Sequence, residues 1–334
     1  MLNTSQGTML VTGATGLVGS HVVERALREG WRVRAVVRSP QSAQWLSDLG
    51  VELVRGDLSD PASLAPTVAG MQVIVHCAAK VGDWGPVEEY RKINVEGLEA
   101  LLTAAVNSPD LRRMIHISSL GVYSAHDHHG TDETTPPNRL GIDGYTLTKV
   151  ESEDLVLEYV RSKKLPAVVL RPGFIYGPRD RTILPKLLER LRSGQFAYLG
   201  SPQNVMNNTY VGNLVEAIFL AIENESITGE VFNITDGRLV TKAEFIETIA
   251  RAAQCPVPTK VVPIGIAKGL ARVLEMTYKL LGKREAPLLS SARIKFLGLN
   301  LDYCIDKARQ QLGYNPSLDF TEAMQLTMKA LQQS

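Results

Sequence analysis

A tyrosine and a lysine stand four residues apart, at Tyr145 and Lys149, in a stretch without proline that is typical of the start of a helix. Side chains at this spacing share one face of a helix, so an ammonium would lie beside a phenol. A nearby positive charge favours the phenolate and lowers the pKa of the tyrosine, toward the range where it exchanges protons. The pair predicts acid–base chemistry, although the same spacing also occurs on ordinary exposed helices.

Three glycines, Gly13, Gly16 and Gly19, follow a short apolar run at residues 8–12 and open a segment with apolar residues at helical spacing. At a strand-to-helix turn, the first glycine permits the tight turn, the second lets the backbone approach a pyrophosphate, and the third lets the helix pack on the strand. The N–H groups at the start of the helix then point at the phosphates. The spacing is G-x-x-G-x-x-G rather than G-x-G-x-x-G, and we predict a dinucleotide site here.

The segment 111–123 is typical of a buried strand that breaks at two serines, Ser118 and Ser119. Ligands bind outside the carboxyl ends of the strands in a parallel sheet. The alternation of strand and helix patterns continues to residue 176, which predicts an α/β fold with one doubly wound parallel sheet and helices on both faces. We therefore place the two serines at a ligand-binding edge of this sheet.

Six motifs, in this order along nearly the whole chain, resemble those of the extended short-chain dehydrogenase/reductases, within the NAD(P)-dependent epimerase/dehydratase superfamily. They are G-x-x-G-x-x-G at 13–19, His-Cys-Ala-Ala at 76–79, Asn-Val-x-Gly at 94–97, Ser-Ser-x-x-Val-Tyr at 118–123, Tyr-x-x-x-Lys at 145–149 and Arg-Pro-Gly-x-x-Tyr-Gly-Pro at 171–178. The resemblance implies a Rossmann fold with a smaller, discontinuous C-terminal substrate domain. Residues 78–94 look most like the branch that holds 3β-hydroxysteroid dehydrogenases, sterol 4-carboxylate 3-dehydrogenases and 2-alkyl-3-oxoalkanoate reductases.

The resemblance also implies a role for each polar residue of the site. The family's catalytic serine stands four residues before the tyrosine of its Val-Tyr pair, which points to Ser119 and leaves Ser118 as a structural neighbour. Ser119 would then hydrogen-bond the substrate oxygen, Tyr145 would donate or accept its proton, and Lys149 would hold the nicotinamide ribose. Asn94 matches a supporting asparagine, for which a structural tie and a direct part in proton relay are both open.

Further contacts follow from the same resemblance. Pro172 and Gly173 match the loop against the nicotinamide ring, and Ala78 with Ala79 matches the small-residue turn beside the cofactor ribose. The expected cofactor contacts are Gly13, Thr15, Gly16, Leu17, Val18, Gly19, Arg38, Ser39, Asp57, Leu58, Ala78, Ala79, Lys80, Lys149, Pro172 and Gly173. Trp84 and Phe174 are expected to line the substrate pocket together with Ser119 and Tyr145.

The end of the second predicted strand bears on the choice of cofactor. An NAD enzyme usually presents an acid there, about twenty residues beyond the glycines, to the ribose hydroxyls. This chain has Val37, then Arg38 and Ser39. Because a guanidinium binds a phosphate bidentately, we predict NADP(H) rather than NAD(H), with Arg38 stacked on adenine or facing solvent as the alternative. Asp57 matches the family's acid that binds the adenine amino group. It also stands just before a predicted helix that begins near Pro61, and both roles can hold at once.

Composition narrows the classes of partner. The 334 residues are 44% hydrophobic, and 36 basic against 35 acidic residues give a formal net charge of +1, so we expect no nucleic-acid partner. The cysteines Cys77, Cys255 and Cys304 are far apart, which argues against disulfides and a zinc site. Three histidines within residues 126–129 are expected in a solvated loop rather than at a metal ion. Residues 1–8 lack the pattern of a secretion signal, so we expect a cytoplasmic protein.

The pattern loosens after residue 178. We expect residues 1–178 to form the Rossmann domain. Residues 205–235 should return to it through a strand and helix from Asn208 and a strand at 229–234. The segments 179–204 and 236–334 should form the substrate-binding domain.

One segment of that second domain, residues 263–283, is predicted to be an amphipathic helix. Its charged stripe is Lys268, Arg272, Glu275 and Lys279. Its other face is apolar and holds Ile266, Leu270, Val273, Leu274, Tyr278 and Leu281. We expect this face to pack on the domain or cover an apolar pocket, with weak peripheral contact to a membrane as the alternative; the charges exclude a spanning helix.

These features predict an NADP(H)-dependent oxidoreductase that interconverts a secondary alcohol and a ketone on a bulky, largely apolar substrate, with Tyr145 as general acid/base. The alternative is a nucleotide-sugar epimerase or dehydratase that retains its cofactor and uses cations for the diphosphate, for which the candidates are Arg179, Arg181, Arg190 and Arg192. A non-catalytic NADP(H)-sensing regulator is less favoured because Tyr145 and Lys149 are both present. By analogy with the family we expect a homodimer through helices near residues 88–105 and 144–160.

Overall fold

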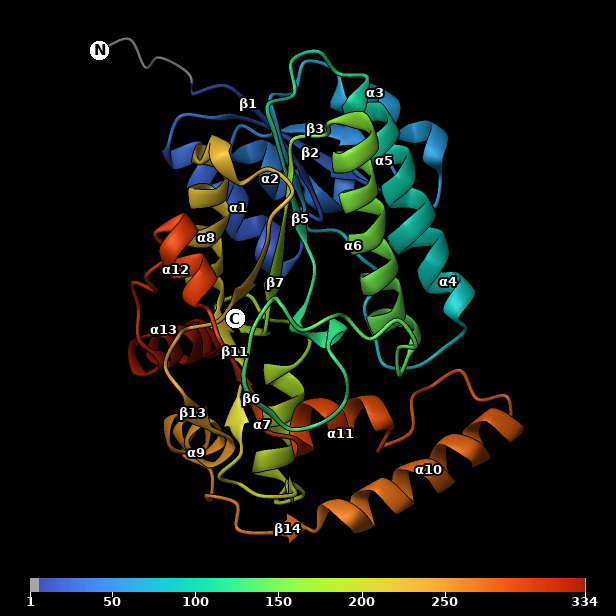
Figure 1. The fold of residues 1–334 in the computed structure, drawn as a ribbon. Coiled ribbons are helices and arrows are strands. Elements are labelled where there is room, and N and C mark those ends of the chain that lie inside the picture. The colour runs from blue at the N-terminus through green and yellow to red at the C-terminus, as the bar shows by residue number, and fades with distance from the viewer. Residues whose placement is uncertain (1–5, 334) are drawn as a thin grey trace.

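A parallel sheet of seven strands forms the centre of the molecule, with the order β12-β7-β5-β4-β1-β2-β3 (Figure 1). The computed structural model describes residues 6–333. The strands are β1 (Thr8–Thr12), β2 (Arg32–Val37), β3 (Glu52–Arg55), β4 (Val73–His76), β5 (Arg113–Ile117), β7 (Ala167–Pro172) and β12 (Val231–Ile234). The order reverses between β1 and β4, which creates a crevice at the carboxyl ends of these two strands. The predicted doubly wound fold is confirmed.

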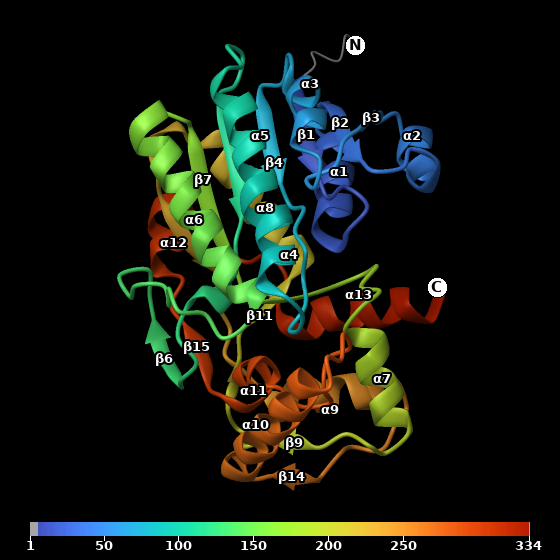
Figure 2. The same ribbon diagram turned by 90° about the vertical axis from the view of Figure 1, so that its right-hand side faces the viewer.

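Helices cover both faces of this sheet (Figure 2). One face is covered by α1 (Leu17–Arg28), α2 (Gln44–Asp48), α8 (Val211–Glu223) and α12 (Asp306–Leu312). The other is covered by α3 (Ala65–Val68), α5 (Gly97–Val106) and α6 (Gly144–Lys163), with α4 (Val87–Arg91) leading into α5. Because both faces are covered, β4 and β5 are buried along their whole length. Short 3₁₀ turns lie at Gln41–Ala43, Pro61–Ser63, Leu120–Val122 and Glu225–Ile227.

A second group of elements lies beyond the carboxyl ends of the strands (Figure 1). It comprises α7 (Leu184–Arg192), β9 (Tyr198–Leu199), β10 (Val205–Met206), β13 (Val240–Thr241), α9 (Lys242–Ala252), β14 (Val261–Val262), α10 (Ile264–Leu280), α11 (Ser291–Gly298) and α13 (Phe320–Gln333). Its own core contains Leu188, Phe245, Ile249, Phe320 and Met324. A separate apolar core of this kind is what allows the group to fold beside the sheet.

The chain returns to the sheet later than we expected. Strand β11 (Asn208–Tyr210) pairs with β8 (Phe174–Tyr176) in a small sheet of its own, and only β12 joins the seven strands. The chain segment before β11 passes close to Gly173, between β7 and β8. A Cβ atom there would lie 1.8 Å from the carbonyl oxygen of Asn207, so the two chains pass too closely for a larger residue.

The boundary between the two groups of elements near the C-terminus also differs from the one that we expected. The residues Ile305, Ala308, Leu312 and Tyr314, in and around α12, pack into the core beside the seven-stranded sheet. We had expected all of 236–334 to belong to the substrate domain. Apolar positions on a helix of seven residues show that it is buried, but they do not show against which neighbour.

The expected solvated histidine loop is wrong for His128. Residues His128–Thr131 form β6, which pairs in parallel with β15 (Leu301–Tyr303), and the His128 side chain is buried. Its Nδ1 and Nε2 lie 2.9 Å from Thr131 Oγ1 and 3.0 Å from the Ser124 carbonyl oxygen, and burial lowers its pKa to about 4. A neutral histidine with both nitrogens hydrogen-bonded is a structural residue.

The expected packing of the amphipathic helix is wrong for most of its apolar residues. Helix α10 buries only Ala267 and Ala271. Ile266, Leu270 and Val273 are 63%, 50% and 58% exposed, and Leu281 just beyond the helix is 65% exposed. Leu274 and Tyr278 are half-buried. Across residues 6–333, no helix is both long enough and apolar enough to span a bilayer.

Candidate active site

The turn after β1 packs closely on the turn after β4. Gly13 has a φ of +68°, and a Cβ atom on it would lie 2.8 Å from the backbone nitrogen of Ala78. A Cβ atom on Gly19 would lie 2.2 Å from the Gly13 carbonyl oxygen. Both positions therefore require glycine, the first for its conformation and the second for its close approach.

The N-terminus of α1 has the properties of a pyrophosphate site. Gly16 is its N-cap and supplies no side-chain hydrogen bond, and the first turn contains no acidic residue. Thr15 and Gly16 are exposed, while Leu17 and Val18 are half-buried behind them. The unpaired N–H groups and the dipole of the helix favour an anion at this position. The described residues thus fit the phosphates of a dinucleotide.

A guanidinium and a carboxylate follow the ends of the next two strands, Arg38 after β2 and Asp57 after β3. Arg38 is exposed, and within residues 6–333 it forms no recorded hydrogen bond or ion pair; Ser39 Oγ donates to Gln41 Oε1 at 3.0 Å. Asp57 Oδ1 accepts from the N–H and hydroxyl of Ser59, both at 2.8 Å, and these bonds with the charge of Arg38 lower the pKa of Asp57. Asp57 is therefore an anion with Oδ2 available, whereas Leu58 is buried in the core.

Asn94 ties the turn after β4 to helix α6. It lies in a π-helical turn, Lys92–Glu96, and is 3% exposed. Its Oδ1 accepts from the Lys80 N–H at 2.7 Å, and its Nδ2 donates to the Lys80 carbonyl oxygen and to Thr148 Oγ1, both at 3.0 Å. Both amide hydrogens are thus engaged in holding neighbouring segments. The Lys80 ammonium pairs with Glu89 at 2.6 Å, so its expected cofactor contact would have to come from its backbone.

Helix α6 brings Tyr145 and Lys149 to the end of β5. Asp143 caps the helix by accepting from the Thr146 N–H at 2.7 Å. The Lys149 Nζ donates to the Ile117 carbonyl oxygen at 2.7 Å and lies 5.9 Å from the centre of the Tyr145 ring. Ser119 follows two residues later, and its hydroxyl accepts from the Gly121 N–H at 3.0 Å. Ser119 and Tyr145 are half-buried, whereas Lys149 is 5% exposed.

The pKa of Tyr145 differs from our prediction. Burial raises it to about 12, and a hydrogen bond from the Ser119 side chain acts in the lowering direction. Burial also lowers the pKa of Lys149 to about 8. We had expected the ammonium to lower the pKa of the phenol. In the structure the ammonium lies over the ring and is bonded to Ile117, so desolvation of the phenolate dominates.

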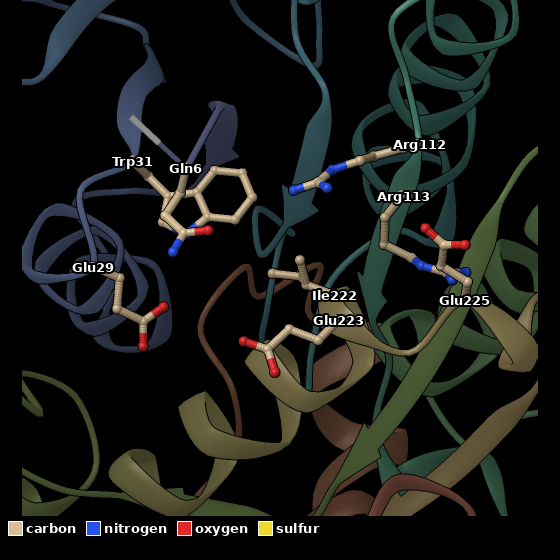
Figure 3. Close-up of a pocket in the computed structure, with 8 residues that line it drawn as sticks. All are labelled: Gln6, Glu29, Trp31, Arg112, Arg113, Ile222, Glu223 and Glu225. Carbon is tan, nitrogen blue, oxygen red and sulfur yellow. The ribbon is translucent and has the colours of Figure 1, made fainter. Parts of the chain in front are cut away.

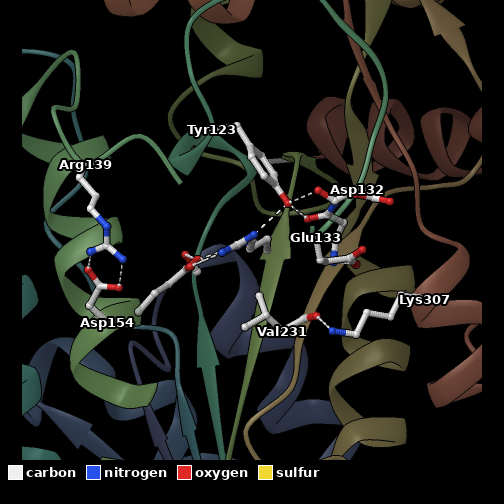
Figure 4. A network of polar contacts seen from close by, with 11 residues as sticks. Tyr123, Asp132, Glu133, Arg139, Asp154, Val231 and Lys307 are labelled. Carbon is white, nitrogen blue, oxygen red and sulfur yellow. Dashed lines mark hydrogen bonds and ion pairs between the residues drawn. The ribbon is translucent and has the colours of Figure 1, made fainter. Parts of the chain in front are cut away.

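A buried ion pair beneath the site was not predicted from the sequence. Arg171 binds both carboxylate oxygens of Glu153 at 2.6–3.1 Å, and both residues are nearly fully buried. Ser118 donates to the same carboxylate. The hydroxyl of Tyr123, which is labelled in Figure 4, accepts from Arg171 at 2.8 Å. Ser118 therefore belongs to this network. Glu153 stands four residues after Lys149 on the same helix face. This spacing could have indicated from the sequence that a carboxylate lies near Lys149.

The predicted substrate-pocket residues lie on two different segments. Phe174 contacts the ring of Phe245 edge-on at 5.7 Å, in the core of the second group of elements. Trp84 donates from Nε1 to the Lys283 carbonyl oxygen at 3.0 Å and meets the Tyr278 ring edge-on at 6.2 Å. Trp84 thus connects the loop after β4 to the C-terminal end of α10. Pro172 is buried and pairs with Ile234.

Other polar features lie apart from this group of residues. The pocket in Figure 3 lies near the amino ends of β2 and β5, away from the glycine turn; its lining includes Trp31, Arg112 and Glu223. Arg179, a candidate for binding a diphosphate, is paired with Glu24 of α1. In the part of the chain that the structure describes, no three His, Cys, Asp or Glu side chains are grouped to hold a metal ion.

Residues 9–235 match the NAD dependent epimerase/dehydratase family. The chain belongs to this family, and within it to the extended short-chain dehydrogenase/reductases. The predicted resemblance is confirmed.

Three curated relatives are dehydrogenases or reductases. A 4-hydroxy-2-methyl-3-oxo-4-farnesyl-3,4-dihydroquinoline-1-oxide ketoreductase of Stigmatella aurantiaca is 31% identical, over 91% of this chain and 90% of its own. A 3-beta-hydroxysteroid dehydrogenase of Mycolicibacterium neoaurum is 31% identical, over 97% of this chain and 91% of its own. A 2-alkyl-3-oxoalkanoate reductase of Shewanella oneidensis is 28% identical, over 94% and 84%. This family member is accordingly an NAD(P)-dependent oxidoreductase of CH–OH and C=O groups.

Two solved structures show the same architecture. The crystal structure of gox2253 has a TM-score of 0.79 and 29% identity and covers 97% of this chain and 98% of its own. A UDP-glucuronic acid 4-epimerase of Bacillus cereus in complex with NAD has a TM-score of 0.75 and covers 98% and 99%. At 21% identity, the epimerase supports the fold of this dehydrogenase/reductase and not its substrate.

Proposed function

We propose that this protein is an NADP(H)-dependent oxidoreductase that interconverts a secondary alcohol and a ketone on a bulky, largely apolar substrate. The observation that carries the proposal is the convergence of Ser119, Tyr145 and Lys149 at the carboxyl end of β5, which is separated by one strand from β1 and its glycine turn. The names of the relatives support the class of substrate, because they include a hydroxysteroid, an oxoalkanoate and a farnesylated ketone.

A bound nicotinamide would supply the hydride for ketone reduction and accept it for alcohol oxidation. The residues of this chain would handle the proton. In the reductive direction the Ser119 hydroxyl would donate to the ketone oxygen, and the Tyr145 phenol would give its proton to that oxygen. A phenol with a raised pKa is fully protonated at neutral pH, so the proton donor is in the required state. In the oxidative direction the Tyr145 phenolate would accept the proton of the substrate hydroxyl, so this direction requires Tyr145 to lose its own proton first.

Arg38 supports the preference for NADP(H). Within residues 6–333 its guanidinium forms no hydrogen bond or ion pair, and Val37 stands where an NAD enzyme usually has an acid. Lys149 would bind the nicotinamide ribose, and Asp57 Oδ2 would accept from the adenine amino group. The alternative of a nucleotide-sugar epimerase loses one of its four proposed cations, since Arg179 is paired with Glu24.

A spectrophotometric assay tests the proposal. The purified protein is given NADP or NAD with hydroxysteroids, 3-hydroxyalkanoates and nucleotide sugars, and reduced-cofactor absorbance is followed. We expect NADPH to form with an apolar alcohol. Cofactor binding without turnover on any alcohol or ketone, combined with conversion of a nucleotide sugar, would establish the epimerase instead. A cytoplasmic location and a homodimer stay predictions.

A further inference from the structure

Helix α10 exposes a continuous apolar face to solvent. Ile266, Leu270, Val273, Met276 and Leu280 are between 50% and 82% exposed. At 100° per residue, these positions fall within an arc of about 120° of the helix. The face is distinct from the buried side, which is formed by the small residues Ala267 and Ala271 against α11. A patch of large apolar side chains of this kind marks a surface for an apolar partner.

A basic stripe lies next to the apolar face on the same helix. Lys268, Arg272 and Lys279 are exposed, and within residues 6–333 none of them forms an ion pair. The acid of the helix, Glu275, is directed to the protein, because its carboxylate accepts from the N–H and hydroxyl of Ser291 at 2.6 and 3.0 Å. Residues 260–285 carry six basic and two acidic residues, in a chain whose net charge is +1. The positive charge is thus concentrated beside the apolar face.

The position of α10 leaves this face open. The helix forms the lower edge of the molecule in Figure 1, away from the body, and joins α11 through an extended loop. Its C-terminal end contacts the body through Trp84, whose Nε1 donates to the Lys283 carbonyl oxygen. These contacts hold the side of α10 that carries Ala267 and Ala271 against the protein, so the apolar arc faces outward.

We propose that α10 docks on the surface of an anionic membrane. An interfacial helix inserts large apolar side chains among the acyl chains while Lys and Arg at the margin bind anionic headgroups. The two surfaces of α10 are arranged in this way, side by side along one helix. This inference does not rest on the proposed activity, but it places Trp84, a predicted pocket residue, close to the lipid surface from which an apolar substrate would come.

Vesicle co-sedimentation of the full-length protein tests the proposal. We expect binding to vesicles of phosphatidylcholine with phosphatidylserine, weaker binding to phosphatidylcholine alone, and partial release by salt. The affinity of the triple variant Leu270→Gln, Val273→Gln, Met276→Gln for these vesicles should be lower than that of the wild type by about tenfold or more. Its matched control is Leu49→Gln, Leu239→Gln, Leu326→Gln, which changes leucines of similar exposure elsewhere and should bind as the wild type does.

A second pair of variants separates charge from apolar contact. Lys268→Gln, Arg272→Gln, Lys279→Gln should lose the preference for anionic vesicles, whereas the exposed lysines changed in Lys163→Gln, Lys186→Gln, Lys329→Gln should not affect it. Circular dichroism and turnover of a detergent-dispersed substrate check folding, since none of these residues lies in the active site. The proposal is overturned if the wild type does not bind anionic vesicles, or if both triple variants of α10 bind as it does. It is also overturned if light scattering shows a dimer that only the apolar triple variant dissociates, because the face would then belong to a second copy.

Discussion

Lys149 is fixed to the strand that leads into Ser119, because its Nζ donates to the carbonyl oxygen of Ile117 at 2.7 Å. Ile117 is the last residue of β5, and Ser118 and Ser119 follow it directly. The bond therefore sets the position of α6, which carries Tyr145, relative to Ser119. It also uses one of the three donors of the ammonium and leaves two for a ribose.

The two adjacent serines should respond differently to the same substitution. Ser119→Ala removes the hydroxyl proposed to hold the substrate oxygen, and turnover should fall by about a hundredfold or more. Ser118→Ala removes a hydrogen bond to the buried Glu153 and should lower stability by about 1 kcal/mol with turnover within a few-fold of wild type. Steady-state kinetics and urea unfolding of both variants check this. Equal losses of turnover would contradict the assignment of Ser119.

Glu153 should control the pH dependence of ketone reduction. Burial lowers the pKa of Lys149 to about 8, and the charge of Glu153 raises it. Because the Lys149 ammonium is proposed to hold the nicotinamide ribose, the rate should fall as pH rises through about 8. Glu153→Gln keeps hydrogen-bonding capacity for Arg171 but removes the charge, so this alkaline limb should move to lower pH. A variant that is less stable but has an unchanged pH–rate profile would show that Glu153 acts only in packing.

Arg38 should discriminate between the two cofactors. Arg38→Ala removes a guanidinium proposed to bind the 2′-phosphate, so the Kd for NADPH should rise by about 10- to 100-fold. The Kd for NADH should change little, because NADH lacks that phosphate. Fluorescence titration with both cofactors measures the two constants. The NADP(H) preference fails if both constants rise equally.

Two glycines should give opposite results when changed to alanine. In Gly173→Ala the new Cβ atom would overlap the carbonyl oxygen of Asn207, and the free energy of unfolding should fall by about 1–3 kcal/mol. In Gly269→Ala the Cβ atom would meet no atom within 4 Å, on an exposed helix, and stability should rise by about 0.5–1 kcal/mol. Urea denaturation of the two variants makes the comparison. Unchanged stability in Gly173→Ala would mean that β7 and β8 separate easily.

The sequence contained the local information about the site and the fold. The spacing of Tyr145 and Lys149 places them on one helix face, and the glycine spacing places a helix N-terminus after β1. These features depend on neighbours a few residues apart, for which helix and strand geometry are fixed.

Features that depend on distant neighbours were not predictable in the same way. The pairing of β6 with β15 joins residues far apart in the sequence, so the burial of His128 was missed. The pKa of Tyr145 depends on desolvation by several segments, which residue spacing does not reveal. The sequence showed that α10 has a face of large apolar residues. Only the structure shows that the helix packs on the rest of the protein through the small residues Ala267 and Ala271 and leaves that face exposed.

The central claim is that this chain transfers a hydride between NADP(H) and a substrate carbon, with Tyr145 handling the proton. NADPH with deuterium at the transferable position of the nicotinamide, mixed with an apolar ketone on which the protein is active, tests this most directly. Mass spectrometry should find one deuterium on the carbinol carbon of the alcohol and an equal amount of NADP. Tyr145→Phe should still bind NADPH but form labelled alcohol about 10²- to 10⁴-fold more slowly. Wild-type rates of labelled alcohol formation in Tyr145→Phe, or alcohol without deuterium from the wild type, would contradict the account.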